Sequence, residues 1–185
     1  MRLLATVAIA ALLAACGQQA TPPAPPAEIT TPAPAPVDAN AITAEGWNNL
    51  RVGMTRAEVT AAVGATATPG AVGGSDPQAC DLFHPANAPE GMLVMIQRDV
   101  LTSIILRNNT TLRTDRGFGV GSTAAEIKTA YGASAVSEPH KYVEGAEYIT
   151  IWSVGGPTAT APFVEDANAR GIRYETNAQG VVTAV

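Results

Sequence analysis

Hydrophobic and polar residues follow the same pattern at two places in the chain. Residues 51–64 (RVGMTRAEVTAAVG) and residues 119–132 (GVGSTAAEIKTAYG) agree at seven of fourteen positions without a gap, at an offset of 68 residues. In each copy apolar side chains recur at spacings of three and four, which is typical of a helix with one buried face. A repeat at a fixed offset indicates a duplicated supersecondary unit.

Both ends of each predicted helix are marked by capping residues. Thr55 stands three positions before Glu58, and Thr123 stands three positions before Glu126, which is the spacing of a capping box. Helices this short are marginal alone in water, so each is expected to lie on a surface supplied by its own repeat. Each copy closes on a glycine, the residue that commonly terminates a helix: Gly64 and Gly132. The predicted buried stripes are Val59, Ala62 and Val63, and Ile127, Ala130 and Tyr131.

Strand patterns follow each predicted helix. In the first repeat they cover 80–83, 92–98 and 100–107, with a tight turn near Asp99. In the second repeat they cover 141–143, 147–154, 171–176 and 181–185, with a turn at 177–180. The segment 155–169 contains two prolines and little alternation, so it is predicted to be a surface loop.

Alternation along two of these strands separates a core face from an outer face. The core face is predicted to carry Ile149, Ile151, Ile172 and Tyr174, and the outer face Tyr148, Trp152, Arg173 and Glu175. The fold class expected from these patterns is α+β. Two helix-plus-hairpin repeats, about 48–112 and 116–185, would form one curved antiparallel sheet with both short helices on one face.

The first fifteen residues have the pattern of a targeting segment, with Arg2 ahead of an apolar run too short to remain as a membrane-spanning helix. The run closes on Leu13-Ala14-Ala15-Cys16, which resembles the bacterial lipobox. That resemblance implies cleavage before Cys16 and lipidation of its thiol. Gly17 follows the cysteine in place of an aspartate, which favours the outer membrane, with the protein facing the periplasm. The alternative is an ordinary secretory signal followed by an unrelated cysteine.

Residues 16–40 are rich in proline and alanine and cannot bury enough apolar surface to fold. They are predicted to form an extended tether. The remaining residues, 41–185, are long enough for a single domain with one well-filled core.

The chain is acidic, with eleven basic and sixteen acidic residues and a net charge of −5. It has no basic cluster, which argues against nucleic acid as a partner. If Cys16 is lipidated, Cys80 is the only thiol left and no disulfide can form within the chain. Cys80 is therefore expected to be buried, with pairing to another molecule as the alternative.

The sequence offers little support for catalysis, a metal or another cofactor. His84 and His140 would have to converge with Cys80 or Asp81 to bind a metal, and no close-spaced ligand pair is present. Both histidines are instead expected to be solvent-facing or hydrogen-bonded loop residues. No segment resembles a nucleophile elbow, so the chain is not predicted to be an enzyme.

The candidate binding residues are the aromatic and charged side chains of the outer face, because tyrosine, tryptophan and arginine dominate protein interfaces. They are Tyr142, Tyr148, Trp152, Arg173 and Glu175. A protein-binding surface is the favoured interpretation. Peptidoglycan or another glycan is the alternative ligand, because aromatic rings also stack on sugars. The rings would instead be minor core if the loop 155–169 covers them. The oligomeric state is left open.

The segment Gly53-Met54-Thr55-Arg56-Ala57-Glu58-Val59, behind a lipobox and a tether, resembles the opening of the SmpA/OmlA (BamE-like) outer-membrane lipoproteins. The tandem form is similar to the β-lactamase-inhibitor-protein-like fold. These resemblances imply one curved sheet with helices on its convex side. They also imply a non-catalytic role in envelope assembly or integrity, with an envelope protein as the partner.

Overall fold

The computed structural model describes Asp38, 40–66, Asp76, 78–108, 110–154, Asp166 and 168–185. The chain divides into two units, Met1–Pro34 and Ala35–Val185, and every described residue belongs to the second. Cys16, the predicted signal segment, most of the tether and most of the loop 155–169 therefore lie outside the described residues. Within the described part, no helix is long and apolar enough to cross a bilayer.

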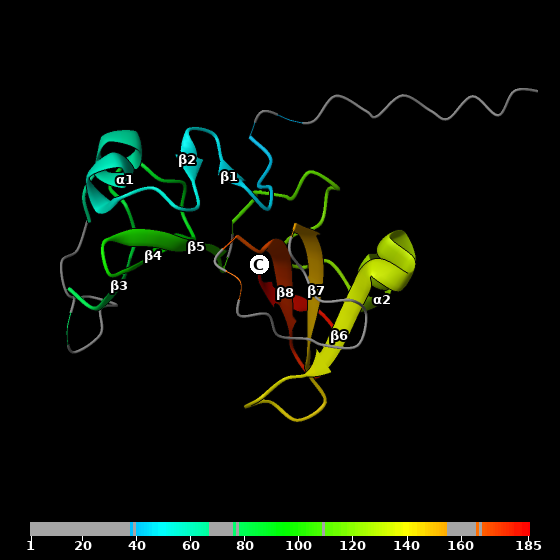
Figure 1. Cartoon of the computed structure of the whole chain (residues 1–185). Helices are drawn as coiled ribbons and strands as arrows, with labels where there is room; N and C mark the ends of the chain where they lie inside the picture. Colours follow the sequence, from blue (N-terminus) through cyan, green and yellow to red (C-terminus); the bar gives the residue numbers. More distant parts are fainter. Residues whose placement is uncertain are drawn as a thin grey trace, which may run out of the picture. The chain divides into compact units, whose positions relative to one another are not determined.

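Where the structure describes them, the first repeat and the segment before it contain five strands and one helix (Figure 1). They are β1 (Gly46–Trp47), β2 (Leu50–Arg51), α1 (Arg56–Val63), β3 (Cys80–Phe83), β4 (Met92–Gln97) and β5 (Val100–Leu106). The described part of the second repeat contains one α-helix, a short 3-10 helix and four strands. They are α2 (Ala124–Tyr131), η1 (Gly132–Ser134), β6 (Ala135–Pro139), β7 (Glu147–Val154), β8 (Arg170–Thr176) and β9 (Val182–Ala184).

The prediction of one curved sheet with both helices on one face is wrong. The described strands form three separate antiparallel sheets, β1-β2, β3-β4-β5 and β6-β7-β8-β9, so the fold is richer in strands than a pair of helix-plus-hairpin units. The two larger sheets are bonded at one place. Leu106 donates its N–H to the Val185 carbonyl at 2.8 Å, and Val185 donates to the Leu106 carbonyl at 3.0 Å.

The two sheets cannot merge further because the outer edge of β9 is already occupied. Gly121 donates to the carbonyl of Val182 at 2.9 Å, and Val182 donates to the carbonyl of Ser122 at 2.8 Å. The segment that precedes α2 thus covers the edge that β5 would need. The first repeat has the same pair of hydrogen bonds. The Gly53 N–H donates to the Leu101 carbonyl and the Leu101 N–H donates to the Met54 carbonyl, both at 2.8 Å. This shared arrangement supports the duplication predicted from the sequence.

Both predicted helices and both capping boxes are confirmed. The Thr55 hydroxyl accepts from the Glu58 N–H at 3.3 Å, and the Glu58 carboxylate accepts from the Thr55 N–H at 2.8 Å. The same two bonds at Thr123 and Glu126 measure 3.2 and 2.8 Å. The backbone N–H of each threonine holds the pKa of its partner glutamate below the ordinary value. Each box therefore satisfies backbone donors that the first turn leaves free.

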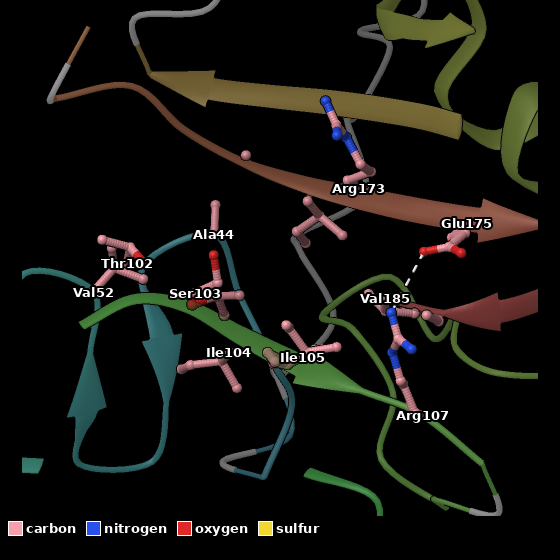
Figure 2. Close-up of a pocket in the computed structure, with 15 residues that line it drawn as sticks. Ala44, Val52, Thr102, Ser103, Ile104, Ile105, Arg107, Arg173, Glu175 and Val185 are labelled. Carbon is pink, nitrogen blue, oxygen red and sulfur yellow. Dashed lines mark ion pairs between the residues drawn. The ribbon is translucent and has the colours of Figure 1, made fainter. Parts of the chain in front are cut away.

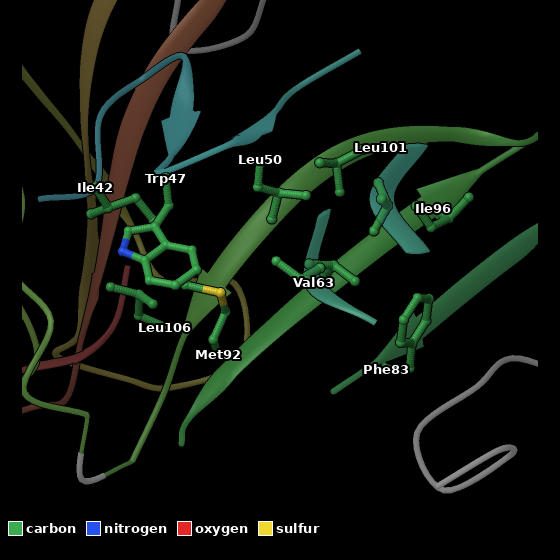
Figure 3. Close-up of a cluster of buried hydrophobic side chains, with 11 residues drawn as sticks. Ile42, Trp47, Leu50, Val63, Phe83, Met92, Ile96, Leu101 and Leu106 are labelled. Atoms are coloured by element: carbon green, nitrogen blue, oxygen red, sulfur yellow. The ribbon is translucent and has the colours of Figure 1, made fainter. Parts of the chain in front are cut away.

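Helix α1 closes a core over the three-stranded sheet. Val59 and Val63 are buried, whereas Ala62 is exposed, so the apolar stripe is narrower than predicted. The β1–β2 hairpin, which the sequence patterns did not predict, adds Trp47 and Leu50 to this core (Figure 3). The other buried members are Ile42, Phe83, Met92, Val94, Ile96, Leu101 and Leu106.

A second core lies under α2. Ile127, Ile149 and Tyr174 are fully buried, with the rings of Phe118 and Tyr131 packed against them. Ala130 is exposed, as Ala62 is in the first repeat. Ile151 and Ile172 also pack against this cluster. The predicted division of β7 and β8 into a core face and an outer face is therefore confirmed.

One predicted strand is wrong and another was missed. Residues 141–143 form a bend, and the strand paired with β7 is β6, just before them. Lys-Tyr-Val has strand-forming side chains, but the backbone reverses here through Gly145, whose φ is +76°. β6 is a partly exposed edge strand that ends in Pro139, so its sequence lacks the alternation of a half-buried strand. Cys80, expected to be buried, is half-buried on β3.

Candidate functional site

The predicted binding residues lie on three segments of the second repeat. Tyr148 and Trp152 are on β7, Arg173 and Glu175 are on β8, and Tyr142 is in the connection between β6 and β7. Antiparallel pairing sets Tyr148 opposite Glu175, two positions along the strands from the pair of Thr150 and Arg173. We call the group formed by Glu138, His140, Tyr142, Tyr148, Arg173 and Glu175 the aromatic–charged surface.

His140 organises this surface, although its side chain is only 5% exposed. Its Nδ1 accepts the backbone N–H groups of Tyr142 and Val143, both at 3.0 Å. Its Nε2 lies 3.0 Å from Oε1 of Glu175. Because Nδ1 accepts two bonds, the ring hydrogen belongs on Nε2, which donates to the carboxylate. The imidazole thus fixes the backbone of the β6–β7 connection to the sheet.

The ring of Tyr148 is in contact with both the imidazole of His140 and the guanidinium of Arg173. The imidazole lies on the Tyr148 ring, with centroids 4.5 Å apart and planes 22° from parallel. The guanidinium of Arg173 lies over the same tyrosine, 5.2 Å from its centroid. Arg173 also donates to Thr150 Oγ1 at 3.4 Å and lies 3.5 Å from a carboxylate oxygen of Glu138. Tyr148 is therefore held between a histidine and an arginine whose own positions are fixed.

Glu175 connects the aromatic–charged surface to the first repeat. One carboxylate oxygen accepts from His140, and the other lies 3.9 Å from Nη2 of Arg107, just after β5. The glutamate side chain is 31% exposed and that of Arg107 is 52% exposed. Screening by water keeps such a pair weak, so its role is to orient the carboxylate rather than to stabilise the fold.

The most exposed part of the surface is the tip of the β6–β7 connection. Tyr142 is 78% exposed and Val143 is 42% exposed, and only one other large hydrophobic side chain in the described part of the chain is comparably exposed. Lys141 holds its ammonium group 5.3 Å from the Tyr142 centroid. Exposed tyrosine side chains such as that of Tyr142 are enriched at interaction sites.

Trp152 does not join this group. It lies farther along β7, opposite Gly171, where it lines a cavity together with Arg98 and Arg170. The Trp152 Nε1 atom is buried and has no hydrogen-bond partner among the described residues. Whether residues 155–165 cover its ring falls outside the described part of the chain. The five predicted residues thus divide into a cluster of four and one separate tryptophan.

The geometry of the histidines does not favour catalysis. Both ring nitrogens of His140 are engaged and the ring is enclosed, so it presents no free base to a substrate. Nδ1 of His84 lies 2.8 Å from the backbone carbonyl of Met92. Both are thus hydrogen-bonded residues outside helices and strands, which is one of the two states expected for them. Among the residues that the structure describes, no group of three or more His, Cys, Asp or Glu side chains could hold a metal.

Sequence reasoning missed two members of the surface, His140 and Glu138. The available signal was their position directly before Tyr142, in the segment Glu138-Pro139-His140. The strand assigned to 141–143 hid that signal, because an extended backbone would carry His140 away from the N–H groups that it binds.

No known protein family, curated protein or solved structure matches this chain. The function of the aromatic–charged surface is therefore inferred from its own residues.

Proposed function

We propose that this chain is a non-catalytic, lipid-anchored envelope module that binds a protein partner through its aromatic–charged surface. Tyrosine and arginine side chains contribute strongly to protein interfaces, and here they stand among charges of both signs. The proposed surroundings are the periplasmic side of a bacterial outer membrane. The lipobox-like segment and the resemblance to small outer-membrane lipoproteins support that location.

One observation carries the proposal. Tyr142 and Val143 are exposed, yet both of their backbone N–H groups are bound by the buried Nδ1 of His140. A tip whose backbone is already held in one conformation loses less conformational entropy when a partner binds. The fold would gain nothing from exposing these two side chains, so a partner is the better explanation of them.

The proposed anchor is the acylated thiol of Cys16. Buried acyl chains contribute about 0.8 kcal/mol per methylene, and more than one chain is needed for stable attachment. Replacing Cys16 by serine is expected to move the protein from the membrane fraction of cells to the soluble fraction. Fractionation followed by immunoblotting measures this, and equal membrane association of the two chains would exclude the anchor.

The partner site is tested by photo-crosslinking in intact cells. A benzoylphenylalanine at position 142 preserves an aromatic ring and is expected to capture a discrete protein. The control places the same group at Thr129, an exposed position on α2. A second measurement compares the affinity of the captured protein for the chain and for Tyr142→Ala. We expect a loss of at least about tenfold, or about 1.4 kcal/mol, from an interface tyrosine.

Two outcomes would contradict this site. The first is equal crosslinking from positions 142 and 129. The second is that the chain binds purified peptidoglycan, that soluble muropeptides compete for this binding, and that Tyr142→Ala abolishes it. That result would favour the glycan as the ligand.

A further inference from the structure

A groove lies between the two larger sheets and is lined in part by Glu175. Its walls are β5 and the first half of β8, and the ion pair of Arg107 and Glu175 closes one end (Figure 2). Its volume is about 280 Å³. The groove exists because, among the described residues, the backbones of the two sheets are bonded to each other at Leu106 and Val185 and separate beyond that pair.

The β5 wall presents an unpaired strand edge. Successive residues of a strand direct their N–H and C=O groups to opposite edges. Leu106 bonds to Val185 on the edge away from β4, so Ile104 directs its backbone groups to the same edge, into the groove. At the other end of this edge Leu101 is bonded to Gly53 and Met54. Among the described residues, the stretch without backbone partners on this edge is thus 102–105, about 13 Å long at the rise of a strand. A bulge at Thr102 leaves Ile104 as the residue of this stretch whose N–H and C=O face the groove.

The groove is lined by apolar side chains from three segments. Val52 follows the β1–β2 hairpin, Ile172 comes from β8, and Val185 follows β9. Ile172 and Val185 also pack against the cores, so these walls are supported from behind. An extended peptide laid along β5 would therefore bury alternate side chains against a formed surface.

The charge of the groove is opposite to that of the chain. The cavity that contains Trp152 continues it, because Ala44, Val52, Thr102 and Gly171 line both. Among the described residues that line the two cavities, the ionised side chains are Arg98, Arg107, Arg170, Arg173 and Glu175. The whole chain has sixteen acidic and eleven basic residues. Arg107 pairs with Glu175 and Arg173 lies near Glu138, whereas among the described residues no ion pair involves Arg98. Arg98 therefore favours an anionic group at its end of the groove.

We propose that this groove binds an extended acidic peptide segment of a partner protein, which adds a strand to the free edge of β5 at Ile104. The backbone of the peptide bonds to Ile104, its apolar side chains lie against Val52 and Ile172, and its carboxylates lie toward Arg98. This site meets the aromatic–charged surface at Arg173 and Glu175 but does not include the exposed tip at Tyr142, which carries the proposed function. It can therefore fail while the proposed function holds, and the reverse is also true.

The first test uses synthetic peptides and the full chain. The probe is a fluorescent peptide of alternating valine and threonine that ends in two aspartates, and binding is read by fluorescence anisotropy. The same peptide with lysines in place of the aspartates is expected to bind at least about tenfold more weakly, because it meets the arginines with like charge. A version of the acidic peptide that is N-methylated along one edge should lose affinity by a similar factor, because it cannot form the backbone hydrogen bonds of an added strand. Equal affinity of all three peptides would overturn the proposal.

The second test uses matched charge reversals. Arg98 lies in the β4–β5 turn with φ of +47°, a conformation that aspartate tolerates better than most residues. Arg98→Asp is expected to weaken the acidic peptide about tenfold or more. Lys141→Asp makes the same change of charge outside the groove and is expected to leave the affinity unaltered. Circular dichroism confirms that both variants are folded, and equal effects of the two reversals would contradict the groove.

A third arm distinguishes a partner from the chain's own tether. A benzoylphenylalanine replaces Thr102, which is exposed and lines both cavities. The acidic peptide is expected to be crosslinked to this position and displaced by an excess of the unlabelled peptide. Position 102 could instead crosslink to residues 16–40 of the same chain. If the acidic peptide does not displace that crosslink, the groove belongs to the tether and the proposal is overturned.

Discussion

Replacing Tyr174 by alanine is expected to lower the free energy of unfolding by about 3–5 kcal/mol, the usual cost of deleting a buried aromatic side chain. Tyr174 is fully buried in the second core. Its ring meets that of Phe118 edge-on, with centroids 6.4 Å apart. Its hydroxyl donates to Thr114 Oγ1 at 3.2 Å, across sixty positions of sequence. Burial raises the pKa of this phenol, so it remains a neutral donor.

Tyr174→Phe separates the packing of the ring from its hydrogen bond. It keeps the contact with Phe118 and removes only the bond to Thr114, so we expect a loss of about 1 kcal/mol. Urea denaturation followed by circular dichroism measures both variants against the parent chain. A cost of Tyr174→Ala no larger than that of Tyr174→Phe would show that the ring is not part of a close-packed core.

Replacing Gly91 by alanine is expected to cost about 2–4 kcal/mol, because steric overlap adds to backbone strain. Gly91 has a φ of +78°, and a Cβ built on it would lie 2.2 Å from the carbonyl oxygen of Arg107. Arg107 also donates its N–H to the Gly91 carbonyl at 2.7 Å. The obstructing atom thus belongs to backbone that is already bonded in place and cannot move aside easily.

Gly121 provides the matched control. Its φ is +91°, but no atom lies within 4 Å of the position that a Cβ would take. Gly121→Ala therefore carries the strain without the overlap, and its expected cost is about 1–2 kcal/mol. Thermal or urea denaturation should rank Gly91→Ala as the more destabilising change. The opposite order would mean that the Gly91 and Arg107 segments are not in close contact in solution.

The features that the sequence predicted correctly depend on neighbours in the chain. A capping box needs only Thr55 and Glu58, three positions apart. The side chains of Ile149 and Tyr148 point to opposite faces of the sheet because side chains alternate along a strand. The inward positions of Val59 and Ile127 follow from helical periodicity. Such signals are written into short segments, which is why they could be identified before any tertiary contact was known.

The features that were missed depend on contacts between distant segments. Whether the strands form one sheet or several depends on Gly121 and Ser122 occupying the edge of β9, which no local pattern reveals. The role of His140 depends on Glu175, which lies 35 positions later. The groove arises only where β5 and β8 separate. Tertiary pairing therefore decided both the sheet arrangement and the membership of the site.

Glu175 gives the two proposed binding regions a common carboxylate. One of its oxygens holds the histidine that shapes the exposed tip, and the other faces the arginine at the end of the groove. A ligand that draws Arg107 away would alter the charge that His140 feels. Thermodynamic linkage requires any such influence to be reciprocal, so two occupants of this molecule would favour or oppose each other to the same extent.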